Sequence, residues 1–128
     1  MSAGAVERAI RAKVAPGRRL STPSIKPAVF EVEALEPDAL VILLGEKRAS
    51  TRVPWDLIEG IPAFLGRNWV KIGGGARVDA DPTALSGYTN AGMPRAAASY
   101  IVAVLDTAGV VEVDPRRPAR VRMSPSFR

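Results

Sequence analysis

The chain has 128 residues and contains neither cysteine nor histidine. Without cysteine it has no disulfide, no thiolate metal site and no cysteine nucleophile. Without histidine it lacks the commonest general base, the commonest metal ligand and the central member of a Ser-His-Asp triad. Catalysis would have to rest on Asp, Glu, Lys or Tyr alone. We therefore expect a protein that is not an enzyme and that holds neither a metal nor a cofactor.

Long apolar runs are missing as well. The longest, Ala39 to Leu44, has the length of a strand, and no run approaches the ~18 apolar residues that a membrane span needs. The start of the chain, MSAGAVERAIRAKV, lacks the apolar core of a signal peptide. We therefore expect no membrane partner and a cytoplasmic location, on the nucleoid if the protein binds DNA.

The charge of the chain is unevenly distributed. The net charge is +5; residues 1–26 carry +5 and residues 94–128 carry +3, whereas residues 27–54 and 55–93 carry −2 and −1. Basic ends on a mildly acidic body fit a polyanionic partner, with nucleic acid first. The alternative interpretation is a solvated tail at each end.

The N-terminal segment is predicted to form a basic arm. The spacing of Val6, Ile10 and Val14 predicts a short amphipathic helix over residues 3–14, and proline and glycine predict a loop over residues 15–27. We expect residues 1–27 to be partly disordered, with basic side chains that neutralise phosphates. These side chains are Arg8, Arg11, Lys13, Arg18 and Arg19.

Residues 28–123 are predicted to form one α+β domain. Alternating apolar residues indicate a β-hairpin over residues 28–44. Helical spacing follows Pro54, but Pro62 interrupts it, so we expect a kink or two short helices. The other predicted elements are a strand at 69–75, short and longer helices at 82–88 and 94–108, and strands at 110–113 and 119–123.

Two further expectations concern the aromatic residues. Trp55 and Trp69 each open an apolar element, so we expect both indoles in the core. Residues 124–128, which include Phe127, are expected to form a mobile C-terminal tail.

The order helix, strand, short helix, longer helix, strand, turn, strand resembles the winged helix-turn-helix family of DNA-binding domains. The resemblance covers residues 54–123, and its most specific part is AVLDTAGVVEVDPRRPARVRM, in which a helix ends at Ala-Gly and an apolar hairpin follows. With the segments before it, the expected fold is α+β: an N-terminal basic helix or arm, a β-hairpin, then a winged helix-turn-helix. The resemblance implies a small transcription regulator or recognition module that binds duplex DNA.

The resemblance also implies which residues contact nucleic acid. The helix from Pro94 would lie in or across the major groove, the turn before it would bond phosphates, and the arginine-rich hairpin would be the wing. The implied residues are Arg95, Ser99, Tyr88, Asn90, Arg116, Arg117, Arg120 and Arg122, to which the arm adds Arg18 and Arg19. No catalytic and no metal-binding residue is expected.

An alternative function follows from the outer face of the 94–108 helix, which has few side chains that could read bases. Base reading normally uses Arg, Lys, Asn or Gln, and of these the face has only Arg95. Either binding is mostly to phosphates, or the small face packs against protein, which would make the chain an interaction or dimerisation module on a winged-helix scaffold. The other residues expected on this face are Ala96, Ser99, Val102, Ala103 and Asp106.

A second resemblance covers residues 30–74, FEVEALEPDALVILLGEKRASTRVPWDLIEGIPAFLGRNWVKIGG. This run is similar to N-terminal modules attached to some HNH-type restriction endonucleases. Those enzymes need His and Asn at the nuclease centre, and this chain has no His. The resemblance therefore implies at most a recognition part without the nuclease.

Overall fold

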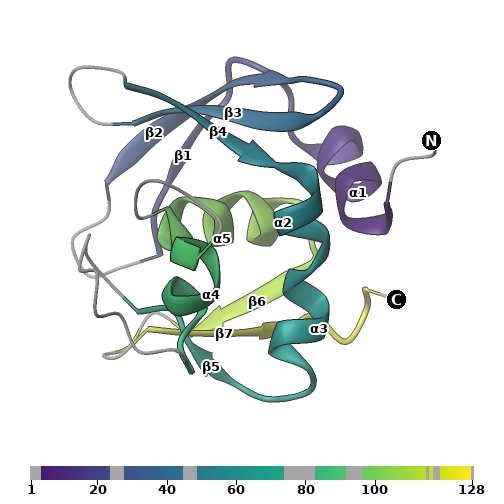
Figure 1. The fold of residues 1–128 in the computed structure, drawn as a ribbon, viewed down its shortest axis with the longest axis vertical. Helices are drawn as coiled ribbons and strands as arrows, with labels where there is room; N and C mark the ends of the chain where they lie inside the picture. Colours follow the sequence, from purple (N-terminus) through teal and green to yellow (C-terminus); the bar gives the residue numbers. More distant parts are fainter. Residues whose placement is uncertain are drawn as a thin grey trace.

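The computed structural model of the chain has three layers: a four-stranded sheet, a layer of helices and a three-stranded sheet (Figure 1). Helix α5 lies between the two sheets, while α2 and α3 run down one side of the molecule and α4 lies next to them, against α5. The structure describes residues 4–23, 28–44, 49–73, 83–91, 97–114, 116 and 119–127.

The four-stranded sheet is antiparallel, and its strands are neighbours in sequence order. It contains β1 (Arg19–Ser21), β2 (Val29–Leu35), β3 (Ala39–Leu44) and β4 (Ala49–Pro54). The hairpin predicted over residues 28–44 is confirmed as β2 and β3. A loop was predicted where β1 lies; this strand forms because Leu20 pairs with Phe30 of β2, a contact that three residues cannot reveal by periodicity.

The helices are short. They are α1 (Ala5–Lys13), α2 (Trp55–Glu59), α3 (Ile61–Leu65), α4 (Leu85–Ala91) and α5 (Ala98–Thr107). The break predicted at Pro62 is confirmed, because Pro62 lies in the first turn of α3, where a missing N–H costs no helical hydrogen bond. Within the described ranges, no helix combines the length and the apolar character needed to cross a membrane.

The three-stranded sheet is formed by β5 (Val70–Lys71), β6 (Val111–Asp114) and β7 (Arg120–Met123). Its order is β5-β7-β6, and both pairs are antiparallel. Gly109 adopts a left-handed backbone, φ 78°, and ends α5 as predicted. From α2 to β7 the elements therefore follow the order that the sequence predicted.

Helix α1 is packed into the core and is not part of a free arm. Ile10 is fully buried, and α1 contacts α2 and α5. The Glu59 carboxylate of α2 caps its first turn, accepting hydrogen bonds from the backbone N–H groups of Val6 (3.3 Å) and Glu7 (2.7 Å). These N–H groups have no partner inside a helix, so the cap ties the two helices together.

Arg11 is one of the expected phosphate-binding residues, but the fold uses its guanidinium internally. Its Nε donates to the Glu7 carboxylate at 2.7 Å. Its Nη1 and Nη2 donate to the backbone carbonyls of Leu35 (3.1 Å) and Glu36 (2.7 Å). The guanidinium also lies 5.1 Å from the ring centroid of Trp55. Arg11 therefore joins α1 to the end of β2 and to α2.

The outer face of α5 is partly covered, which corrects the sequence-based expectation. Val102 and Ala103 were expected to face outward and are buried, whereas Ser99 is half-buried and Asp106 is exposed. Tyr100 meets Phe30 of β2 edge to face, with ring centroids 5.1 Å apart, and α5 also contacts β1. The four-stranded sheet therefore packs directly on α5.

The C-terminal residues 124–127 continue the fold instead of forming a free tail. The Ser124 N–H donates to the Val110 carbonyl at 2.9 Å, and the Phe127 N–H donates to the Ser124 carbonyl at 3.1 Å. The half-buried Phe127 ring packs against the core. Phe127 is thus held beside the three-stranded sheet.

Replacing Glu59 by Ala is expected to lower the free energy of unfolding by about 1 to 2 kcal/mol, because it removes the cap of α1. Glu59→Gln should lower the free energy of unfolding by less, since its amide oxygen still accepts a hydrogen bond. Urea denaturation followed by circular dichroism measures both variants. Glu33→Ala on the exposed side of β2 is the matched control and should change stability by less than about 0.5 kcal/mol. Equal losses at Glu59 and Glu33 would contradict the capping role.

Candidate nucleic-acid interface

The outer face of the three-stranded sheet carries the arginines of the β6–β7 hairpin. Strand pairing places Arg120 of β7 between Lys71 of β5 and Asp114 of β6. Side chains alternate along a strand, and the neighbouring Val121 is fully buried. The charged side chains therefore share the face that points away from α5.

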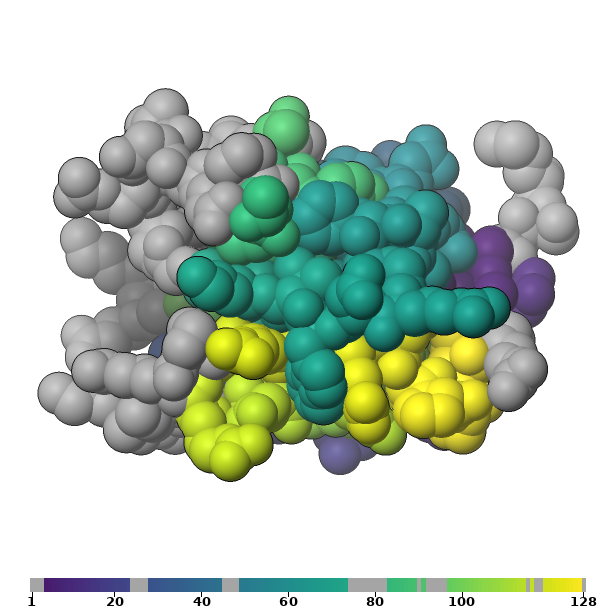
Figure 2. Space-filling model, turned by 90° about the horizontal axis from the view of Figure 1, so that it is seen from below, coloured from purple at the N-terminus to yellow at the C-terminus, as the bar shows by residue number. Residues whose placement is uncertain are grey.

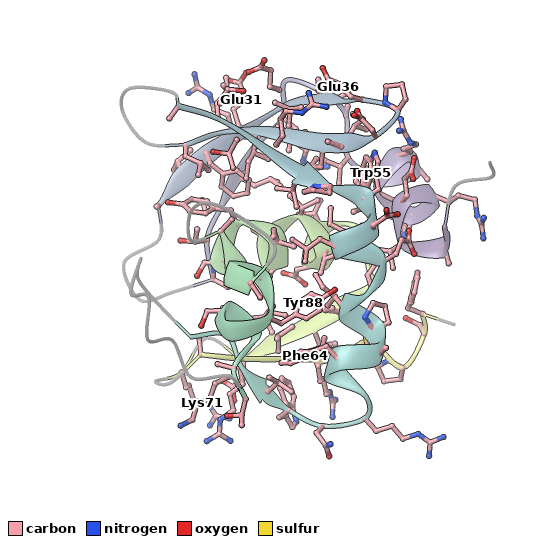
Figure 3. The ribbon with its side chains drawn as sticks, viewed as in Figure 1. Glu31, Glu36, Trp55, Phe64, Lys71 and Tyr88 are labelled. Carbon is pink, nitrogen blue, oxygen red and sulfur yellow. The ribbon has the colours of Figure 1, made fainter. Side chains whose placement is uncertain are left out.

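Positive charge is concentrated on this face. Lys71 lies at the lower edge of the molecule, on the opposite side from Glu31 and Glu36 (Figure 3). Seen from below, β5 and the segment before it meet β7 and β6 on one surface (Figure 2). We use the name hairpin face for Trp69 and the charged residues here, which are Arg67, Lys71, Arg116, Arg120 and Arg122 with Glu112 and Asp114.

The four-stranded sheet has a different charge balance, because its basic residues lie next to carboxylates. Arg52 of β4 pairs with both Glu36 and Asp38. Arg19 of β1 lies 3.9 Å from the Glu31 carboxylate. On this sheet the carboxylates therefore balance the neighbouring arginines, whereas the hairpin face carries more basic than acidic side chains.

Asp114 and Arg116 form an ion pair where β6 ends. The Nε and Nη2 of Arg116 donate to the two carboxylate oxygens at 3.0 Å each, and its backbone N–H donates to Oδ1 at 3.1 Å. These hydrogen bonds lower the pKa of Asp114 and raise that of Arg116. The Arg116 side chain is 88% exposed, so the pair is screened by water and contributes little to stability.

Trp69 is exposed, contrary to the expectation that it belongs to the core. Its relative exposure is 41%, whereas Trp55 is buried and its Nε1–H donates to the Glu36 carbonyl at 2.8 Å. Alternation explains the difference: Ile72 points inward, so Trp69 is brought to the outer side with Lys71. The same alternation is visible in the sequence and could have predicted that Trp69 is exposed.

Arg122 connects Trp69 to the β6 strand. Its guanidinium carbon lies 4.5 Å from the centroid of the Trp69 ring. Its Nη2 and Nε lie 2.7 Å and 2.9 Å from Oε2 of Glu112, the residue opposite it across the sheet. An acid, a guanidinium and an indole thus form a fixed row across the hairpin face.

A groove of about 540 Å³ lies beside Arg122. Gly66 turns the chain at its side with a left-handed backbone, φ 58°, which places Arg67 at the rim. The groove is lined by Gly66, Arg67, Arg122, Met123, Ser124, Pro125 and Phe127. It combines two guanidinium groups with the apolar surfaces of Met123, Pro125 and Phe127.

The structure does not bring the predicted arm residues to this face. Arg18 donates through Nη1 to the Lys13 carbonyl at 3.2 Å. Arg19 belongs to β1 of the four-stranded sheet. Of the predicted residues, Arg116, Arg120 and Arg122 lie together. Arg18 and Arg19 lie at the four-stranded sheet instead.

Tyr88 and Ser99 are placed on helices away from the hairpin face. The Tyr88 hydroxyl donates to the Leu57 carbonyl at 2.7 Å, its ring stacks on Phe64 at 5.1 Å, and burial raises its pKa. Tyr88 therefore joins α4 to α2 and α3 (Figure 3). Ser99 is half-buried at the start of α5. Arg95, Arg117 and the side chain of Asn90 lie outside the described residues.

Acidic residues do not gather into a metal site in the described ranges. There, no three Asp or Glu side chains are placed so that they could hold a metal ion. Glu36 and Asp38, which are two residues apart, both face Arg52.

Comparisons with protein-family models, with curated proteins and with solved structures found no match to the chain. The functional interpretation therefore depends on the geometry and chemistry described above.

Arg116→Ala is expected to raise the pKa of Asp114 toward its ordinary value, because it removes the hydrogen bonds that favour the carboxylate. A depressed carboxyl pKa stabilises the fold above about pH 4, and this contribution is lost as the pH falls below that value. Carbon-detected NMR titration of the carboxyl group measures the change. Arg120→Ala is the control and should shift the pKa less, because Arg120 acts only through space. An equal shift of the Asp114 pKa in both variants would show that the hydrogen bonds of Arg116 are not the main cause of its low value.

Proposed function

We propose that the chain is a non-catalytic nucleic-acid-binding protein, acting as a small regulator or recognition module, and that its hairpin face contacts phosphates of duplex DNA. The observation that carries the proposal is the concentration of five basic and two acidic side chains on one sheet face and the two turns beside it. Within the described part of the chain, Arg67 and Lys71 have no salt-bridge partner on this face. The non-catalytic part rests on the absence of His and Cys from the sequence.

The ion pairs of the hairpin face are compatible with phosphate binding. Exposed pairs such as Arg116–Asp114 are worth only about 0 to 1 kcal/mol, so a phosphate can take the place of the carboxylate at small cost. Arginine also presents a planar fork of donors that suits phosphate oxygens. Lys71 and Arg120 are cross-strand neighbours, which places two cations side by side on the sheet.

The order of elements from α2 to β7 supports a winged-helix interpretation of residues 54–123. The burial of Val102 and Ala103 favours contact through the hairpin instead of the middle of α5. Phosphate contacts carry no sequence information directly. We therefore expect low sequence specificity and an affinity in the range of about 10⁻⁴ to 10⁻⁶ M at physiological salt.

The alternative function, an interaction or dimerisation module, loses part of its sequence argument. That argument was the small, uncharged outer face of the 94–108 helix. Val102 and Ala103 of this face are buried within the chain itself, so they offer no surface to a second protein.

The proposal predicts a salt dependence that can be assigned to one face. Each phosphate neutralised contributes a slope of about −0.9 to log K against log salt concentration for duplex DNA. Removing two contacts with Lys71→Ala and Arg120→Ala should therefore reduce the magnitude of the slope by about 1.8. Fluorescence anisotropy with a labelled short duplex at several salt concentrations measures it.

The matched control removes two charges from the other sheet, with Arg19→Ala and Arg52→Ala. It leaves the same net charge, so it should keep the slope of the unmodified protein. Equal slopes in the two double variants would show that overall charge, not the hairpin face, attracts DNA. Absence of any salt-dependent binding would overturn the proposed function.

A further inference from the structure

We infer that the hairpin face prefers single-stranded nucleic acid to duplex, because Trp69, Arg122 and the adjacent groove accept an unpaired base. This inference rests on the proposed function and adds a ligand class to it. Its structural basis is the position of an exposed indole and an aromatic-lined groove within the basic surface.

The exposure of Trp69 is the first step. Among the described residues, the exposed large hydrophobic side chains are Val29, on the other sheet, and Trp69 at 41%. An indole at the surface leaves a large apolar area in water, and the π-face of a base can cover that area. The neighbouring cations, Arg67 and Lys71, are available for the phosphates on either side of such a base.

Arg122 makes the site rigid. Its guanidinium is held on one side by Glu112, at 2.7 Å, and lies over the Trp69 ring at 4.5 Å. Because its charge is partly compensated by Glu112, its planar surface is better suited to stacking than to phosphate binding. Guanidinium planes and aromatic rings both stack with unpaired bases.

The groove provides room next to this stack. It measures about 540 Å³, which is within the range of small-ligand pockets, and Arg122 is one of its walls. Phe127 and Met123 supply apolar surface, and Arg67 supplies a cation at the rim. When one base of a strand stacks on Trp69, the next base along the strand can therefore enter the groove.

Duplex DNA cannot use these features. Its bases are paired and stacked on one another, and unstacking one of them costs a few kcal/mol. A single strand has no such cost and can place its bases on the protein while its phosphates contact the cations. The same face thus binds duplex through phosphates alone and single strands through phosphates and bases.

The test compares three probes: an oligothymidylate of about 12 nucleotides, an abasic oligonucleotide of the same length and charge, and a duplex of the same length, which carries about twice as many phosphates. Fluorescence anisotropy gives the affinity of each for the full chain. We expect Trp69→Ala to weaken oligothymidylate binding by about 5- to 100-fold, the effect of losing one base–aromatic stack. The abasic strand and the duplex should change by less than about twofold.

Val29→Ala is the matched control, because it truncates the other exposed hydrophobic residue and should alter none of the affinities. A second measurement uses the unmodified protein, so it stays informative if Trp69→Ala fails to fold. Oligothymidylate should quench tryptophan emission and protect it from acrylamide, whereas the abasic strand should do neither. Trp55 is buried, so the change reports on Trp69.

The possible outcomes separate the inference from the proposed function. Salt-dependent binding of the oligothymidylate and the abasic strand with equal affinity, or an equal loss for all three probes with Trp69→Ala, overturns the base-stacking inference and leaves phosphate binding intact. Unchanged tryptophan emission on saturation with oligothymidylate also overturns it. Absence of binding to every probe overturns both the inference and the proposed function.

Discussion

The burial of α5 between two sheets is the constraint on which the rest of the structure depends. This helix contacts β6 of the three-stranded sheet and β1 of the four-stranded sheet, and its Tyr100 meets Phe30 of β2. Val102 and Ala103 are buried as well. Gly109 then ends the helix, and the Val110 N–H donates to the Leu105 carbonyl at 2.9 Å, which directs the chain into β6. The orientation of the β6–β7 hairpin is therefore set by a buried helix.

The electrostatic contrast between the two sheets follows from local pairing. On the four-stranded sheet, Arg52 and Arg19 lie beside carboxylates of β2 and the turn after it. On the hairpin face, Glu112 and Asp114 each hold one arginine, and further cations remain. If the basic residues lay in a solvated tail at each end of the chain, both tails would be basic and the folded body would not. Folding instead uses Arg11 of the N-terminal segment in contacts within the molecule, and it gathers basic side chains of the C-terminal segment on the hairpin face.

Local patterns in the sequence predicted the elements well, and the contacts between distant residues less well. Alternation gave the β2–β3 hairpin, Pro62 gave the helix break, and Gly109 gave the end of α5. The burial of α1 was not predictable, because its cap comes from Glu59, 52 residues away from Glu7. Residue type also gave a wrong prediction for α5. Alanine and valine are compatible with either solvent exposure or close packing, so Val102 and Ala103 were placed outside although they are buried. Trp69 is different, since strict alternation from Ile72 would have placed it outside, and its apolar character was given too much weight.

The docking of α1 against α2 and α5 has a consequence for the integrity of the molecule. The residues from α2 to β7 bury side chains against α1 and the first sheet, and Ile10, Val32 and Ile42 complete a hydrophobic cluster shared by both halves of the chain. Excising either half would expose this shared cluster to water. The two halves should therefore melt in one cooperative transition, so that loosening the N-terminal helix also loosens the surface formed by the last two strands.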